Sequence, residues 1–199
     1  MSDHTNWAPS KATFERAASG AFVPSWDTVE TFVLVTITNE ELHVGSSGGA
    51  MVRAQELWIR ARRATRAPYY VHKAPDPSLI SSEADLSRAL RHQHVWAGYP
   101  TPGEMERMSG PGELPSSTTR RIIEGNTLPV DPTQTVAFLN ACYVLAPADL
   151  EAWLAATVRV FGKSTTRSPG KWTSAHSKLL KEIQAAADEQ DSPPLLRAA

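Results

Sequence analysis

Hydrophobic positions recur along this chain at spacings of three and four residues, which is the spacing of an amphipathic α-helix. Phe14, Ala17 and Ala18 share one helical face in this way near the N-terminus, and a second such face lies within 119–123. A further run from 82 to 95 keeps its apolar residues on one side. The pattern predicts an all-α fold built from short helices.

The predicted helices form an internal repeat, because the segments 10–61 and 115–156 match in order and at near-constant spacing. The second copy holds one extra residue after its proline. The matched residues are Thr13 with Thr118, Arg16 with Arg121, Gly20 with Gly125, Pro24 with Pro129, Phe32 with Phe138 and Trp58 with Trp153. Such a repeat indicates that one structural unit occurs twice.

Each copy is predicted to contain three helices joined by turns. A glycine stands where the first helix ends in a left-handed residue, and a proline four residues later prevents the helix from resuming. Asp27 and Asp131 are expected to cap the second helix, with Pro132 at a first helical position. Trp58 and Trp153 on the third helix are interpreted as core anchors and not as ligand contacts.

The second copy is preceded by two further predicted helices. Ser82 begins a capped helix, and Thr101 or Pro102 begins a short helix that ends in the glycine-containing stretch 109–112. A short helix, a glycine turn and another short helix form a helix-turn-helix arrangement. Only nine residues precede Ser10, so the first copy is predicted to be incomplete. Its apolar face would need cover from the second copy, a second chain or residues further upstream.

Composition supports this picture and limits the alternatives. The chain has 199 residues, 41% hydrophobic and 21% charged, which is ordinary for a globular protein. Its one cysteine, Cys142, excludes an internal disulfide framework. No apolar run approaches a membrane span, so a cytoplasmic protein without a membrane partner is expected. The predicted domains are 1–66, a partial repeat; 67–81, a proline-containing linker; 82–162, a complete helix-turn-helix domain; and 163–199, a basic tail with one amphipathic helix.

The net charge of −1 argues against nucleic acid as a partner, but the charges are unevenly distributed. The stretch 53–73 holds six basic residues and one acidic residue, and 160–181 holds five basic residues and no acidic one, so each has a net charge of +5. Such blocks are either phosphate-binding surfaces or solvated helix faces. The candidate phosphate contacts are Arg62, Arg63, Arg66 and Lys163.

The segment 10–20 and the Val-Pro pair that follows it resemble the Xre/Cro-type helix-turn-helix domains of GC-rich bacteria. The second copy resembles this family over residues 82–162. The resemblance implies tandem λ-repressor-like bundles, with 115–124 as a recognition helix in the major groove of double-stranded DNA. It implies base contacts from Ser116, Ser117 and Arg121, and phosphate contacts from Thr118 and Arg120. In the first copy the corresponding residues are Lys11, Thr13 and Arg16.

Other candidate chemistry is weak. His92 and His94 do not share a helix face, and no cysteine or carboxylate cluster accompanies them, so no metal is expected. Gly162 and Lys163 match the end of the phosphate-binding loop motif, but Thr157 stands where that motif requires glycine. The sequence therefore predicts a non-enzymatic, cofactor-free transcriptional regulator at the nucleoid. The alternative is a protein-interaction or assembly module, a homodimer or a complex with another protein, built on a degenerate repeat.

Overall fold

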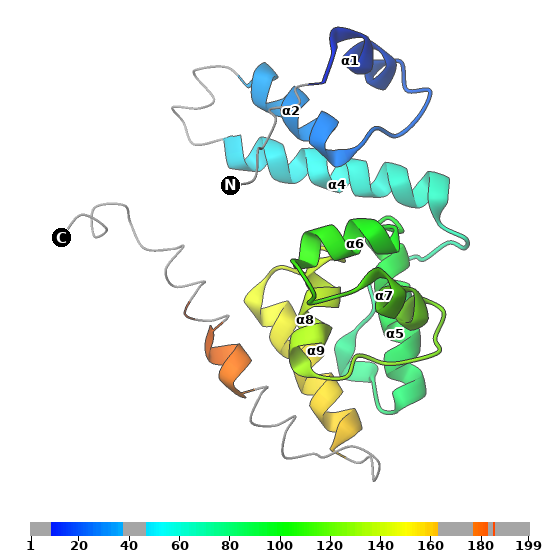
Figure 1. Cartoon of the computed structure of the whole chain (residues 1–199), viewed down its shortest axis with the longest axis vertical. Helices are drawn as coiled ribbons and strands as arrows, with labels where there is room; N and C mark the ends of the chain where they lie inside the picture. Colours follow the sequence, from blue (N-terminus) through cyan, green and yellow to red (C-terminus); the bar gives the residue numbers. More distant parts are fainter. Residues whose placement is uncertain (1–8, 38–46, 163–176, 183–184, 186–199) are drawn as a thin grey trace, which may run out of the picture. The chain divides into compact units, whose positions relative to one another are not determined.

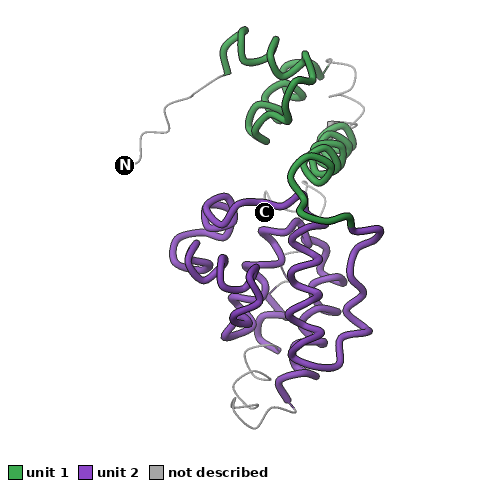
Figure 2. Tube along the Cα trace, turned by 90° about the vertical axis from the view of Figure 1, so that its right-hand side faces the viewer, with its two compact units in different colours: residues 1–70 green, residues 71–199 purple. Residues whose placement is uncertain are grey.

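The structure, a computed structural model, describes residues 9–37, 47–162, 177–182 and 185. Over these residues it consists of helices and their connections, without a strand, and the predicted all-α fold is confirmed (Figure 1). The chain divides into two compact units, Met1–Tyr70 and Val71–Ala199 (Figure 2). The division falls within 67–81, the stretch that the sequence predicts to be a linker.

Unit 1 contains the helices α1 (Lys11–Ala18), α2 (Trp26–Thr36) and α4 (Ser47–Arg66). The side chains of Ser10 and Ser25 cap α1 and α2 by accepting from the backbone N–H three residues further on. The prediction that Asp27 caps α2 is wrong. Asp27 lies inside the first turn, where a carboxylate interacts favourably with the positive end of the helix dipole. Trp58 of α4 is buried and donates its indole N–H to the carbonyl of Pro24 at 2.9 Å, as expected of a core anchor.

Unit 2 contains η1 (Pro77–Leu79), α5 (Glu83–Trp96), α6 (Pro102–Ser109), α7 (Ser116–Ile123), α8 (Pro132–Asn140) and α9 (Pro147–Phe161). Its caps agree with the sequence. Ser82 and Asp131 each accept a hydrogen bond from a backbone N–H in the first turn of α5 and α8. Thr101 forms a reciprocal capping box with Glu104 at the start of α6, satisfying two backbone donors at once.

The core of unit 2 lies between the helices α5 to α9. Helix α5 packs against α7 and α9, α6 against α7 and α8, and α8 against α9. Each of them contributes large side chains of which at most 3% is exposed: Leu86, Leu90, Met105, Ile122, Phe138, Leu139, Trp153 and Phe161. Burying a side chain of this size stabilises a fold by about 1.5–3 kcal/mol. This shared core fixes the orientation of α7.

Part of the predicted linker is folded onto unit 2. Ile80 is 3% exposed and belongs to the hydrophobic core. Arg159 of α9 donates to the carbonyl of Ile80 at 2.9 and 3.1 Å and to the carbonyl of Pro77 at 2.9 Å. A guanidinium can satisfy several carbonyls from one position because its donors form a rigid fork. The segment 77–80 is therefore a packed element of unit 2 and not an extended connector.

The predicted tail is described only in part. Residues 177–182 are helical, and Lys178 pairs with Glu182 at 3.6 Å. The residues 163–176, which include Lys163, lie outside the described part of the chain. Among the described helices, none combines the length and the hydropathy required to cross a lipid bilayer.

Candidate nucleic-acid interface

Helices α6 and α7 are two short helices joined by the turn 110–115. Gly110 and Gly112 adopt φ values of 90° and 79°. This left-handed region is open to glycine at little cost and costs other L-residues about 1–2 kcal/mol. Leu114 at the end of the turn is completely buried. The turn is therefore shaped by its glycines and anchored by Leu114, which together set the direction in which α7 leaves α6.

Helix α7 buries one face and exposes the other. Thr119 and Ile122 are 0% and 1% exposed, and Ile123 packs against the core, as the sequence predicts. The Thr119 hydroxyl donates to the carbonyl of Pro115 at 3.1 Å, so its burial leaves no unsatisfied donor. The residues expected to contact DNA are the exposed Ser117, Arg120 and Arg121 and the half-buried Ser116 and Thr118.

The exposed face of α7 is electropositive. The helix contains two arginines and no acidic residue, and neither Arg120 nor Arg121 forms an ion pair with another described residue. At the N-terminus Pro115 occupies the cap position, and no side chain caps the helix. Uncapped N–H groups at the positive end of the helix dipole are suited to a phosphate oxygen. The uncapped N-terminus of α7 and its two exposed arginines thus favour an anionic partner.

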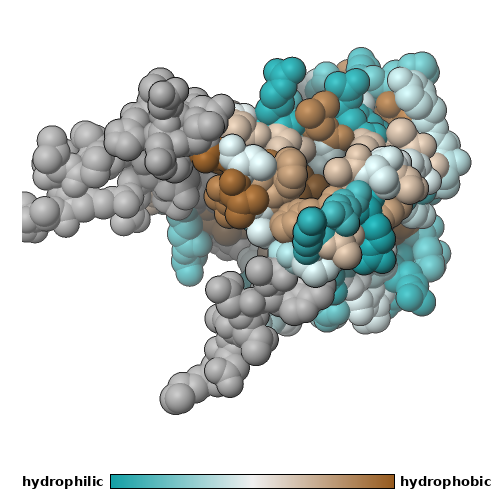
Figure 3. Space-filling view, turned by 90° about the horizontal axis from the view of Figure 1, so that it is seen from above, coloured by the Kyte–Doolittle hydropathy of each residue, from teal (hydrophilic) through white to brown (hydrophobic). Residues whose placement is uncertain are grey.

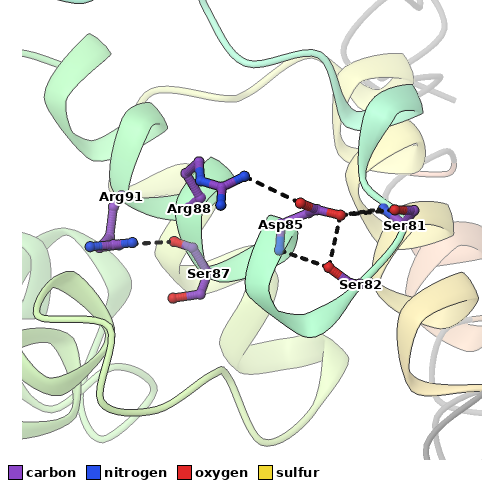
Figure 4. A network of polar contacts seen from close by, with 6 residues as sticks. All are labelled: Ser81, Ser82, Asp85, Ser87, Arg88 and Arg91. Atoms are coloured by element: carbon purple, nitrogen blue, oxygen red, sulfur yellow. Dashed lines mark hydrogen bonds and ion pairs between the residues drawn. The ribbon is translucent and has the colours of Figure 1, made fainter.

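The N-terminus of α5 is held by a polar network around Asp85 (Figure 4). Its carboxylate accepts from the hydroxyls of Ser81 and Ser82 at 2.8 Å each and lies 3.3 Å from Arg88. The hydrogen bond from Ser82, followed by that from Ser81 and the charge of Arg88, lowers the pKa of Asp85 below its ordinary value. The network fixes where α5 begins and so helps to position the helix that packs on α7.

Arg91 of α5 is a cation beside α7 that sequence reasoning missed. Its Nε donates to the carbonyl of Ser87 at 3.4 Å (Figure 4). A Cβ built on Gly125 would lie 3.5 Å from the Arg91 guanidinium, so Arg91 stands at the C-terminal end of α7. A cation there complements the helix dipole. No local sequence signal identifies this neighbour, because the two residues meet only through the packing of α5 on α7.

Helix α1 of unit 1 matches α7 in length and in the glycine that follows its last turn. Both helices have eight residues, and both are followed by a glycine of positive φ, 72° at Gly20 and 81° at Gly125. Their starts differ, because Ser10 caps α1 whereas α7 has no side-chain cap. The two helices therefore share their length and the conformation of the glycine that follows them.

The polar residues of α1 are engaged within the helix itself. Lys11 lies 3.7 Å from Glu15, and the Nε of Arg16 donates to the carbonyl of Ala12 at 3.3 Å. The Thr13 hydroxyl lies 3.0 Å from that of the cap residue. Lys11 and Arg16 are exposed and Thr13 is half-buried. The basic residues lie at the surface, while Thr13 belongs to the helix cap.

The arginines of α4 have different environments. Arg62 is only 3% exposed, and its guanidinium lies 4.5 Å from the centre of the Trp58 ring. This is the geometry of a cation–π contact. The predicted phosphate contact at Arg62 is therefore corrected, because the side chain is buried. Partial burial lowers the pKa of Arg63 from its ordinary value, and Arg66 is exposed.

The histidines and the cysteine of unit 2 have structural surroundings. His94 is buried, with its Nε2 2.7 Å from the carbonyl of Pro100 and its ring against that of Tyr99. Cys142 is buried, and desolvation raises the pKa of its thiol, which disfavours the reactive thiolate. Among the described residues, no group of three histidine, cysteine or carboxylate side chains is placed to hold a metal ion.

Comparisons of the chain with protein-family models, with curated protein sequences and with solved structures find no match. Function has to be inferred from the geometry of the two units.

Proposed function

We propose that this chain is a sequence-specific DNA-binding regulator that inserts α7 into the major groove. The observation that carries the proposal is the division of α7 into a buried face, with Thr119 and Ile122, and an exposed face with serines and two arginines. A helix anchored in this way has a fixed backbone, so binding has to order its exposed side chains but not the helix itself.

The roles of the residues follow from their positions on α7. The first turn presents Ser116 and Ser117, whose hydroxyls can donate to or accept from base edges. Arg121 can form two parallel hydrogen bonds to the O6 and N7 atoms of guanine, which is worth about 1–3 kcal/mol of discrimination. Thr118 and Arg120 are assigned to the phosphate backbone, which positions the protein without reading sequence.

The test is selection of bound fragments from sheared genomic DNA by the full-length chain, followed by sequencing. The expected result is a short enriched motif that the double variant Arg120→Ala/Arg121→Ala no longer selects. The matched control is Arg53→Ala, which removes an exposed arginine from α4 in unit 1 and should select the same motif. Failure of the wild-type chain to enrich any sequence would contradict the proposal.

A second candidate function is a protein-interaction module built on a degenerate repeat. The net charge of −1 and the exposure of Phe32 and Leu34 in unit 1 favour it. The two candidates differ in their response to salt. DNA affinity falls steeply between low and moderate salt, because phosphate contacts release condensed counterions. Binding to mixed DNA fragments at two salt concentrations therefore separates them.

A further inference from the structure

The exposed surface of α7 differs in kind from that of unit 1. Unit 1 exposes Phe22, Phe32 and Leu34, and apolar residues gather on the face of the molecule drawn in Figure 3. The exposed face of α7 instead carries Arg120 and Arg121, and neither of them forms an ion pair with another described residue. Cations without a counter-ion attract an anion, so this surface indicates the chemistry of its partner.

Arg91 of α5 is a third cation beside α7, and most of its hydrogen-bonding capacity is unused. Its Nε donates to the carbonyl of Ser87 at 3.4 Å, which is the one hydrogen bond of its side chain within the described part of the chain. Its two terminal nitrogens have no partner there, and Arg91 forms no ion pair with another described residue. The residue is half-buried. A cation that is partly removed from water favours an anion that can replace the lost solvation.

The position of Arg91 is defined by Gly125, the residue that follows the C-cap of α7. The Arg91 guanidinium lies 3.5 Å from the place that a Cβ of Gly125 would occupy. The backbone N–H groups of residues 124–127 already donate to the carbonyls of residues 120–122 in the last turn of α7, and Arg91 donates to none of these carbonyls. Arg91 therefore acts on this end of the helix through its charge and not as a hydrogen-bonding cap.

We propose that Arg91 binds a backbone phosphate of DNA at the C-terminal end of α7. This inference rests on the proposed insertion of α7 into the major groove. A helix of eight residues is about 12 Å long, and the major groove is about 12 Å wide. An anion at the uncapped N-terminus of α7 and an anion beside Arg91 can therefore be phosphates on the two strands that border one groove. Contacts of this kind hold the helix at both ends and fix its register without reading sequence.

The other charges at this end of α7 explain why a phosphate contact there needs Arg91. The C-terminus of a helix carries a partial negative charge of about half an elementary charge, which repels a phosphate. Glu124 is exposed and adds a carboxylate, which accepts from the side chain of Asn126 at 2.9 Å. Arg91 offsets this repulsion, and its two terminal nitrogens present parallel N–H donors that match two phosphate oxygens.

The contact is tested by filter binding of the full-length chain over a series of salt concentrations. The probes are mixed genomic DNA fragments and a duplex that carries the motif selected from them. Arg91→Gln should weaken binding to both probes about tenfold and reduce the slope of log affinity against log salt concentration by about 0.9, the amount expected for one lost phosphate contact. The matched control is Arg91→Lys, which keeps the charge and should retain the wild-type slope.

Glu124→Gln tests the same contact in the opposite direction. It removes the negative charge but keeps an oxygen that can accept from Asn126, so both probes should bind more tightly. A wild-type slope in Arg91→Gln would overturn the inference, because a purely structural role of Arg91 changes stability and not the number of phosphate contacts. A wild-type chain that binds mixed fragments but selects no motif would contradict the proposed function, and the slope of Arg91→Gln would still decide the phosphate contact.

Discussion

At the scale of single residues, Asp85 shows how a polar side chain fixes the start of a helix. Its carboxylate accepts from Ser81 and Ser82 and pairs with Arg88 (Figure 4). All of these partners prefer the ionised carboxylate, which is why its pKa is lowered. A carboxyl whose pKa is lower in the folded than in the unfolded chain stabilises the fold above its unfolded pKa, about 3.9. That stabilisation is lost as the pH falls through the folded pKa.

We therefore expect the free energy of unfolding of the Asp85→Asn variant to depend less on pH in the acid range than that of the wild-type chain. The wild-type chain should be the more stable one near neutral pH, and the difference should shrink as the pH falls below about 4. Urea midpoints of both proteins between pH 2 and 7 measure this difference. Parallel profiles across the acid range would show that the carboxylate of Asp85 has the same pKa in the folded and the unfolded chain.

Neighbouring arginines on α7 are expected to act differently in DNA binding. Arg121→Ala should relax the preference at one base pair by about 1–3 kcal/mol, because a bidentate contact to guanine is lost. Arg120→Ala should weaken binding to all sequences alike, because a phosphate contact carries no sequence information. Affinities for a set of single-base operator variants distinguish the two. Equal losses on every variant from both substitutions would refute the assigned orientation of α7.

At the scale of elements, much of the fold can be predicted because its signals are local. The caps at Ser82, Thr101 and Asp131 involve partners within three or four residues, and the structure contains all three. The prediction for Asp27 is wrong because Ser25, two residues earlier, is the N-cap of α2, and a short hydroxyl side chain caps a helix as well as a carboxylate does. The burial of Arg62 and the contact of Arg91 with the end of α7 depend on packing between distant segments, so no local pattern predicts them.

The end of α7 gives a prediction at this scale. Gly125 has a φ of 81°, and a Cβ there would find only ordinary contacts at 3.5 Å. Gly125→Ala should therefore lower the free energy of unfolding by about 1–2 kcal/mol through backbone strain alone. Gly125→Asn should lower it less, because asparagine tolerates this conformation better than alanine. Urea denaturation of the three proteins tests this order, and equal stability of the alanine and asparagine variants would contradict it.

At the scale of the whole molecule, the two units share two eight-residue helices, α1 and α7, that the sequence matches to each other. In unit 2, α7 packs against α5 and α6, and Phe138 of α8 is completely buried, whereas Phe32, its counterpart in the sequence match, is 48% exposed among the described residues of unit 1. The sequence predicts the repeat because matching residues keep their order and spacing. The apolar pocket between α1 and α2, which Phe14, Ala17, Ala18 and Phe32 help to line, cannot be predicted in this way, because it depends on how the two helices pack. Over the described residues, the two units therefore differ in the burial of these matched positions.

Substitution of the basic residues of α4 tests whether unit 1 contributes to the electrostatics of DNA binding. Each phosphate contact adds roughly 0.9 to the slope of log affinity against log salt concentration. The double variant Arg63→Gln/Arg66→Gln should therefore reduce this slope by the amount expected for about two lost phosphate contacts. Arg62→Gln should leave the slope unchanged, because Arg62 is buried over Trp58. It should instead lower the stability of unit 1, since a cation–π contact contributes about 0.5–2 kcal/mol. A slope that responds to Arg62→Gln and not to the double variant would reverse the assignment of these arginines.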